Sequence, residues 1–178
     1  MAVYRSPYEA YPFLCDADDD LRCDFELLTD ELASATGLLQ SQIEERALAE
    51  ELLWVCELIY HMNPTLRTFF SVTEDEIARM ASAVDRMQAE SKTHGFVLPC
   101  GCQSACVAHL LRVKAKELVR LLYRYLQRGG EVPAGLLDLC NLLSGYFFLL
   151  ALKLNAQNGV EEHSYRSRNY HEAIDRKK

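Results

Sequence analysis

Apolar residues recur at spacings of three and four along most of the chain, which is the period of an amphipathic helix. In the first such segment the repeating positions are Phe25, Leu28, Leu32, Ala35 and Leu39. The pattern predicts five helices, at about 22–42, 44–61, 73–90, from the turn at 99–101 to 128, and 133–157. No segment alternates convincingly with a period of two. We therefore expect an all-α fold, a five-helix up-and-down bundle.

Residues at the predicted helix ends support these boundaries. Thr73 and Glu76 form a capping box, in which each side chain satisfies a free backbone N–H of the other residue. Pro64 ends the second helix, because the residue before a proline is pushed away from helical geometry. Gly129-Gly130 ends the fourth helix, and Pro133 suits the first turn of the fifth. The last two helices, at about 25 residues each, would be ~38 Å long.

Length and charge narrow the class of protein. The 178 residues fit a single domain over 1–178, with an irregular N-terminal segment at 1–20 and a charged tail at 166–178. A net charge of −7 argues against broad binding of nucleic acid or of an anionic membrane. The N-terminus lacks a secretory signal pattern, and Asp138, Asn141 and Lys153 interrupt the most apolar segment. We expect a cytoplasmic protein whose seven cysteines are reduced.

Three cysteines lie in the short stretch FVLPCGCQSAC, at positions 100, 102 and 106, with His94 close by. Together they could form a four-ligand metal site. Their spacing, however, is not one of the common zinc patterns, which place cysteines in two separate pairs. A free cysteine also behaves as a small buried apolar residue. We favour this second interpretation and expect no metal, while the metal site remains the alternative.

A basic row runs along the predicted fourth helix, where spacings of three and four place its members on one stripe. These residues are His109, Arg112, Lys116 and Arg120. Such a stripe can hold phosphates, or it can be a solvated face with salt bridges. Apolar neighbours place it at the edge of the core. Asp30 is a candidate partner for one of these cations, because its neighbours in the sequence are expected to face inward.

Asn141 and Ser144 lie one turn apart in the apolar fifth helix. Buried polar groups need hydrogen-bond partners. We therefore expect the two residues to be buried and either to bond across helices or to face a ligand.

Five short motifs in one order resemble a known family. TDELASATGLL, GFVLPCG, AHLLR, NLLSGYFFLLALKLN and GVEE, spread over residues 16–165, are similar to the PduO-type ATP:cob(I)alamin adenosyltransferases. The resemblance implies a five-helix bundle that assembles as a homotrimer, with active sites between subunits. It also implies a reaction in which the 5′-deoxyadenosyl group of MgATP is transferred to the cobalt of cobalamin and triphosphate is released.

The resemblance further implies roles for individual residues. Asp30 matches an acidic residue that pairs across the subunit interface with the arginine matched by Arg112. Phe96 matches an aromatic residue that lies under the corrin ring and displaces the lower axial ligand of cobalt. The remaining candidates for cofactor binding are Lys116, where the family has an ATP-binding arginine, Asn141 in the nucleotide site, Arg120 in the basic row, and His109, for which helix packing is an equal alternative.

This chain departs from the family pattern mainly in the ATP half of the site. Residues 1–15 contain no glycine, although family members have a Thr- and Gly-rich loop there that wraps the triphosphate. Lys116 keeps the charge of an arginine without its planar fork, and Glu117 adds a negative charge. We favour a divergent corrinoid adenosyltransferase. The alternative is an inactive, adenosyltransferase-like corrinoid-binding or scaffold protein without a working ATP site.

Overall fold

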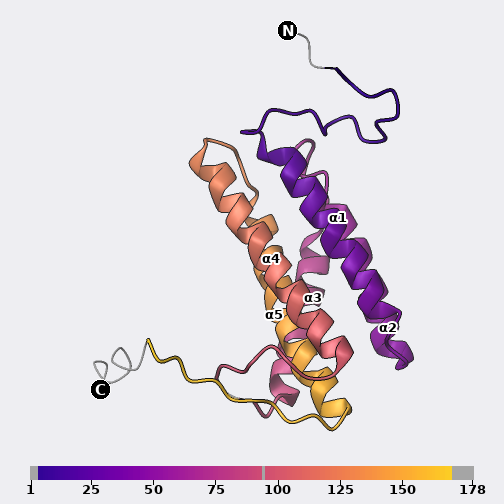
Figure 1. Cartoon of the computed structure of the whole chain (residues 1–178), viewed down its shortest axis with the longest axis vertical. Coiled ribbons are helices and arrows are strands. Elements are labelled where there is room, and N and C mark those ends of the chain that lie inside the picture. The colour runs from indigo at the N-terminus through magenta and orange to yellow at the C-terminus, as the bar shows by residue number, and fades with distance from the viewer. Residues whose placement is uncertain (1–3, 94, 170–178) are drawn as a thin grey trace.

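The computed structural model describes residues 4–93 and 95–169. Five helices make up the fold (Figure 1): α1 (Leu21–Gln40), α2 (Arg46–Met62), α3 (Glu74–Glu90), α4 (Gln103–Gln127) and α5 (Ala134–Gln157). Within the described ranges there is no strand beyond a single isolated bridge. The predicted all-α, five-helix bundle is confirmed, and each predicted helix is found with ends that differ by no more than a few residues.

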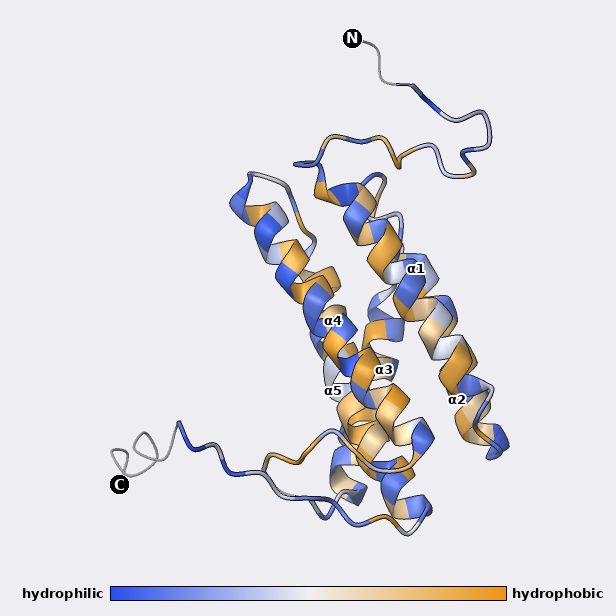
Figure 2. Cartoon of the chain, in the orientation of Figure 1, coloured by the Kyte–Doolittle hydropathy of each residue, from blue (hydrophilic) through white to orange (hydrophobic). Residues whose placement is uncertain are grey.

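The helices pack side by side in the order α2, α1, α4, α5, α3. Helix α1 lies against α2 and α4, α4 lies against α5, and α5 lies against α3. Figure 2 shows polar and apolar residues in alternating bands along α1 and α4, as expected for helices with one buried face. Fully buried side chains from these helices, including Phe25, Leu58, Leu118 and Phe147, form one core. The remaining faces of α1 and α4 are available for function.

Helix α5 is the central core helix. Of the helices in the described part of the chain, it alone is long and apolar enough to cross a membrane, and 61% of the relevant window is buried inside the bundle. The polar residues that interrupt its apolar run are too few to exclude a membrane span by composition, contrary to the expectation from the sequence. Burial by the surrounding helices accounts for its apolar character instead.

The start of α3 matches its predicted capping box. Thr73 Oγ1 accepts the Glu76 N–H at 3.2 Å, and the Glu76 carboxylate accepts the Thr73 N–H at 2.8 Å. Pro133 differs slightly from expectation, because it precedes α5 as its N-cap residue. Proline has no N–H to leave unsatisfied at a helix start, so both positions suit it.

A buried ion-pair cluster holds the irregular N-terminal segment against the bundle. Arg67, whose side chain is 12% exposed, donates to Glu26 at 2.7 Å and to Asp16. Its guanidinium also lies 3.7 Å from the ring centre of Phe13, within cation–π range. Asp16 and Phe13 belong to the segment before α1, so these contacts determine where that segment crosses the end of the bundle.

Candidate functional site

Phe96 lies in the non-helical segment between α3 and α4, and its side chain is 81% exposed. Two backbone hydrogen bonds join this segment to the chain that follows α5. Tyr165 N–H donates to the Phe96 carbonyl at 2.8 Å, and Leu98 N–H donates to the His163 carbonyl at 2.9 Å. Gly95 precedes Phe96 with φ of +93°, a conformation that favours glycine. The backbone of Phe96 is therefore held while its ring faces outward.

Asn155, near the end of α5, is fully buried and bonds to three neighbouring groups. Its Oδ1 accepts the Cys102 N–H at 3.0 Å. Its Nδ2 donates to the Cys100 carbonyl at 3.0 Å and to Glu162 Oε1 at 2.9 Å. Gly101 has φ of +138°, and a Cβ added there would lie 2.0 Å from Asn155 Oδ1. Only glycine fits this close approach.

Asn155 and Glu162 were not among the candidate residues predicted from the sequence. A signal for Asn155 was present, because it is a polar residue at the end of the apolar run LALKLN, and a buried asparagine must have partners. The identity of those partners could not be read from the sequence. They come from one segment, Cys100 and Cys102, which lies more than fifty positions earlier in the chain, and from Glu162 beyond the helix end.

The three cysteines of the turn are half-buried free thiols. Cys102 is the N-cap residue of α4, and Cys106 Sγ lies 3.7 Å from the Gly101 carbonyl. Within the described residues, no three His, Cys, Asp or Glu side chains gather as metal ligands would. His94, the proposed fourth ligand, lies outside the described residues. Cys100 and Cys102 contact the Asn155 side chain through their backbone groups.

The basic row on α4 runs from the core out to solvent. His109 is buried, Arg112 is half-buried, and Lys116 and Arg120 are exposed. The expected position at the core edge therefore holds for Arg112 but not for the whole row. Lys116 and Arg120 are solvated, and they form no ion pair or side-chain hydrogen bond among the described residues.

His109 and Arg112 meet around the ring of Phe148. The His109 and Phe148 ring centres are 6.3 Å apart, and the Arg112 guanidinium lies 5.7 Å from the Phe148 ring centre. Neither ring nitrogen of His109 has a hydrogen-bond partner in the described structure, and the buried Arg112 Nε also lacks one. Burial, and secondarily the Arg112 charge, lower the pKa of His109, so its imidazole is neutral at pH 7.

Asp30 points outward, contrary to the expectation that it faces inward. It is exposed on α1, next to the buried Thr29, because one residue along a helix rotates the side chain by about 100°. Its carboxylate accepts the Tyr60 hydroxyl at 2.6 Å, and this hydrogen bond raises the pKa of Tyr60. The ion pair between α1 and α4 is made instead by Glu31 and Lys114.

Asn141 is exposed, so the premise that it is a buried polar residue of α5 is wrong. Its Nδ2 donates to the Leu137 carbonyl of its own helix at 2.9 Å. The buried positions around it are Leu139, Cys140 and Leu143. Helix α5 is apolar nearly all round, so its sequence does not reveal which face is covered. Asn141 therefore lies at the surface, with its amide bonded within α5.

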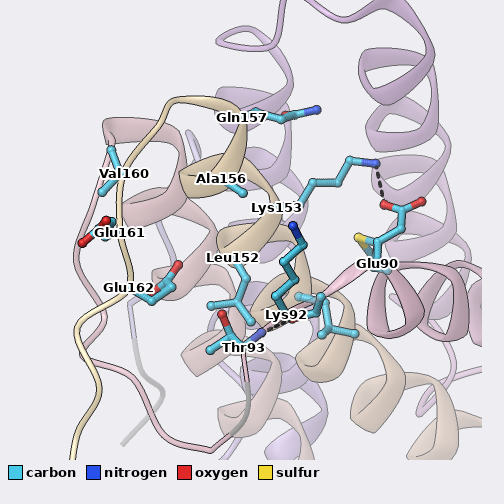
Figure 3. A pocket seen from close by; sticks show the side chains of 13 residues that line it. Glu90, Lys92, Thr93, Leu152, Lys153, Ala156, Gln157, Val160, Glu161 and Glu162 are labelled. Atoms are coloured by element: carbon cyan, nitrogen blue, oxygen red, sulfur yellow. Dashed lines mark hydrogen bonds and ion pairs between the residues drawn. The ribbon is translucent and has the colours of Figure 1, made fainter.

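A cavity of about 660 Å³ lies between the end of α3 and the last turns of α5 (Figure 3). Its apolar lining includes Met87, Leu149 and Leu152, and Lys153 Nζ pairs with Glu90 at 3.3 Å at its edge. Residues 160–162 form one wall and continue into the segment that bonds to Phe96. None of the candidate catalytic or cofactor-binding residues predicted from the sequence lines this cavity.

Comparison with known proteins establishes the family. Residues 17–154 match the family model described as cobalamin adenosyltransferase. The chain belongs to the cobalamin adenosyltransferase family. A curated relative, the corrinoid adenosyltransferase of Bacillus subtilis (strain 168), is 27% identical over 157 residues, covering 83% of this chain and 81% of that protein. The resemblance found in the sequence motifs is confirmed.

Solved structures of the PduO-type ATP:corrinoid adenosyltransferase from Lactobacillus reuteri share the fold. An arginine-to-lysine variant complexed with ATP is 26% identical, with a TM-score of 0.74 over 83% of this chain and 88% of that one. A phenylalanine-to-histidine variant complexed with cobalamin and ATP is 22% identical, with a TM-score of 0.76 over 89% and 97%. Both confirm the helical-bundle architecture of this family for nearly the whole chain.

Proposed function

We propose that the protein is an ATP:corrinoid adenosyltransferase that transfers the 5′-deoxyadenosyl group of ATP to cob(I)alamin. The observation that carries this proposal is Phe96, an aromatic ring held outward by a fixed backbone in a member of the cobalamin adenosyltransferase family. In the reaction, the cobalt(I) electron pair attacks C5′ of the ribose, the C5′–O bond breaks, and triphosphate leaves with that bonding pair. The protein supplies position and a dry site, while the corrinoid supplies the nucleophile.

In this proposal, Phe96 covers the lower face of the corrin ring. Covering an exposed phenylalanine with an apolar surface removes it from water, which lowers the free energy of the complex. A ring in that place leaves no room for the lower axial ligand of cobalt. Loss of this ligand makes reduction to cobalt(I) easier, which provides the nucleophile.

The exposed residues Lys116, Arg120 and Asn141 are proposed to bind the nucleotide with Mg²⁺. Two cations without partners among the described residues can pair with phosphate oxygens at little desolvation cost. Lysine in place of arginine keeps the charge but not the bidentate geometry. The arginine-to-lysine variant of the Lactobacillus reuteri enzyme was solved with ATP, so such a change is compatible with ATP binding in that enzyme.

We propose that the protein assembles as a homotrimer in which Asp30 of one subunit pairs with Arg112 of the next. Asp30 is exposed and bonds only to the uncharged Tyr60 in the described structure, and Arg112 has an unpartnered Nε. The Arg112 Nε is itself buried, and the proposal rests on the two charges, neither of which has an oppositely charged partner among the described residues of its own protomer. We also propose a cytoplasmic location, because the cysteines are free thiols and that compartment keeps thiols reduced.

The test is incubation of the protein with chemically reduced cobalamin and MgATP. Adenosylcobalamin and triphosphate should form in equal amounts. Phe96→Ala should abolish the four-coordinate cobalt(II) spectrum, while Leu98→Ala, at a neighbouring exposed position in the same segment, should leave it intact. Corrinoid binding without any product would reject the transferase and favour the binding-protein alternative.

A further inference from the structure

The position of the Phe96 ring depends on its backbone, because the ring itself is largely without packing contacts. With 81% of the side chain exposed, neighbouring side chains do little to hold it. The two hydrogen bonds from Tyr165 to Phe96 and from Leu98 to His163 form an antiparallel contact with residues 163–165. Whatever fixes residues 163–165 therefore also fixes Phe96.

Residues 160–165 are held at their start by Asn155. The Val160 N–H donates to the Asn155 carbonyl at 2.9 Å, and the Asn155 side chain donates to Glu162 at 2.9 Å. The same side chain holds the backbone at Cys100 and Cys102 on the other side of the Phe96 segment. The buried Asn155 amide thus connects the segment that follows Phe96 with the segment that pairs with it.

The hydrogen-bonding groups of the Asn155 side chain are all used in this arrangement. An asparagine side chain has two N–H donors and one carbonyl oxygen, and in Asn155 both donors and the oxygen are used. Glu162 completes the arrangement with Oε1, while its Oε2 is buried without a partner in the described structure. A buried acceptor without a partner reduces stability. A carboxylate placed here at such a cost suits a positioning role better than a purely stabilising one.

We propose that Asn155 and Glu162 are positioning residues that hold Phe96 in place for the corrinoid. The inference rests on the proposed function, in which Phe96 faces the corrin ring. Neither residue needs to touch the corrinoid. They act through the backbone of residues 96–98 and 163–165, so their loss loosens the ring and does not remove it.

The first measurement needs no corrinoid. Hydrogen exchange at the Leu98 and Tyr165 amides reports directly on the contact between the two segments. In Glu162→Ala, both amides should exchange about tenfold faster, as expected from the loss of one hydrogen bond to a charged acceptor. Glu162→Gln keeps an acceptor oxygen for Asn155 and should restore slow exchange. Glu161→Ala, at the adjacent exposed position, is the matched control and should change nothing.

The second measurement is the four-coordinate cobalt(II) spectrum of bound cobalamin. Glu162→Ala should reduce this species about tenfold, and Glu162→Gln should retain it. In a Phe96→Ala background, Glu162→Ala should cause no further loss of cobalamin affinity, because both changes act through one ring. A purely structural role would lower the thermal midpoint without this dependence on Phe96.

Each outcome decides between the proposals. Unchanged exchange at Leu98 and Tyr165 in Glu162→Ala would overturn the positioning role, as would a loss of cobalamin affinity that adds to that of Phe96→Ala. If the wild-type protein forms no four-coordinate cobalt(II), the proposed function of Phe96 fails, while the exchange data still decide whether Glu162 holds the segment. Should Glu162→Ala not fold, Glu162→Asp, which shortens the reach by one methylene, takes its place in every arm.

Discussion

Two regions of this bundle are built in opposite ways. The clamp end, formed by Phe96, Gly101, Asn155 and Glu162, is held by hydrogen bonds within the protomer. The basic flank, formed by Lys116, Arg120 and Asn141, is exposed. Among the described residues, its only side-chain hydrogen bond is the one from Asn141 to its own helix. The clamp end is therefore preorganised by the chain, whereas the basic flank awaits partners from outside it.

The difference follows from what burial demands of a polar group. A buried amide such as Asn155 must find partners when the protein folds, because leaving them unmade costs about 1–3 kcal/mol per group. Exposed cations are solvated and can remain unpaired at almost no cost. Substitutions at the clamp end should therefore reduce stability, while substitutions at the basic flank should reduce ligand binding and leave the fold intact.

The largest effect is expected at Gly101, where the clamp end is tightest. Gly101→Ala combines an unfavourable φ of +138° with a Cβ 2.0 Å from Asn155 Oδ1, so at least one Asn155 hydrogen bond must break. We expect the free energy of unfolding to fall by about 3 kcal/mol, measured by urea denaturation. Gly129→Ala is the matched control, because Gly129 has φ of +86° with open space around it, and it should cost only about 1 kcal/mol. Equal losses of unfolding free energy in the two variants would show that the close approach of Gly101 to Asn155 adds nothing to the cost.

The next effect is expected at Lys116 on the basic flank. Lys116→Gln removes one exposed charge from the proposed phosphate site, so KM for ATP should rise about tenfold. The free energy of unfolding should stay within about 0.5 kcal/mol of the wild type. Arg124→Gln, which removes an exposed charge further along α4, is the control and should leave KM unchanged. A similar rise in both variants would mean that general charge, and not a site at Lys116, attracts ATP.

The smallest effect concerns His109, which lies between the two regions. The pKa of this buried imidazole is lowered by burial and then by Arg112, so the unfolded chain binds its proton more readily than the folded one. This contribution to stability is complete above the unfolded pKa of about 6.5 and is lost as the pH falls below it, by at most about 1.4 kcal/mol per pH unit. His109→Leu should flatten the stability profile between pH 7 and 5, measured by thermal denaturation. An unchanged slope would show that His109 takes up its proton equally in both states.

The helices and their ends were predictable because they depend on neighbouring residues. The capping box at Thr73 is made by residues three positions apart, and the end of α4 at Gly129-Gly130 needs only the local backbone freedom of glycine. The family resemblance likewise depended on short motifs in a fixed order, and the match over residues 17–154 confirmed it.

The candidate site was harder to predict where the orientation of a helix decided the outcome. Asn141 and Asn155 lie on the same apolar helix, and the pattern offered no way to see that the first is exposed and the second fully buried. Asp30 was expected to face inward because its neighbours are apolar, yet one position of rotation places it beside Tyr60 at the surface. The proposed roles of Phe96, Lys116, Arg120 and Asn141 in binding remain predictions.

The sequence by itself determined that this protein is an all-α bundle of the cobalamin adenosyltransferase family, because helical periodicity, caps and motif order are all local properties of the chain. Only the tertiary structure decided which polar residues face the core and which segments they join. Asn155 bonds to Cys100, Cys102 and Glu162 because folding brings the start of α4 and the chain after α5 to the same end of the bundle. Hydrogen bonds act over about 3 Å in space and are indifferent to separation along the chain, so no local pattern could have revealed these partners.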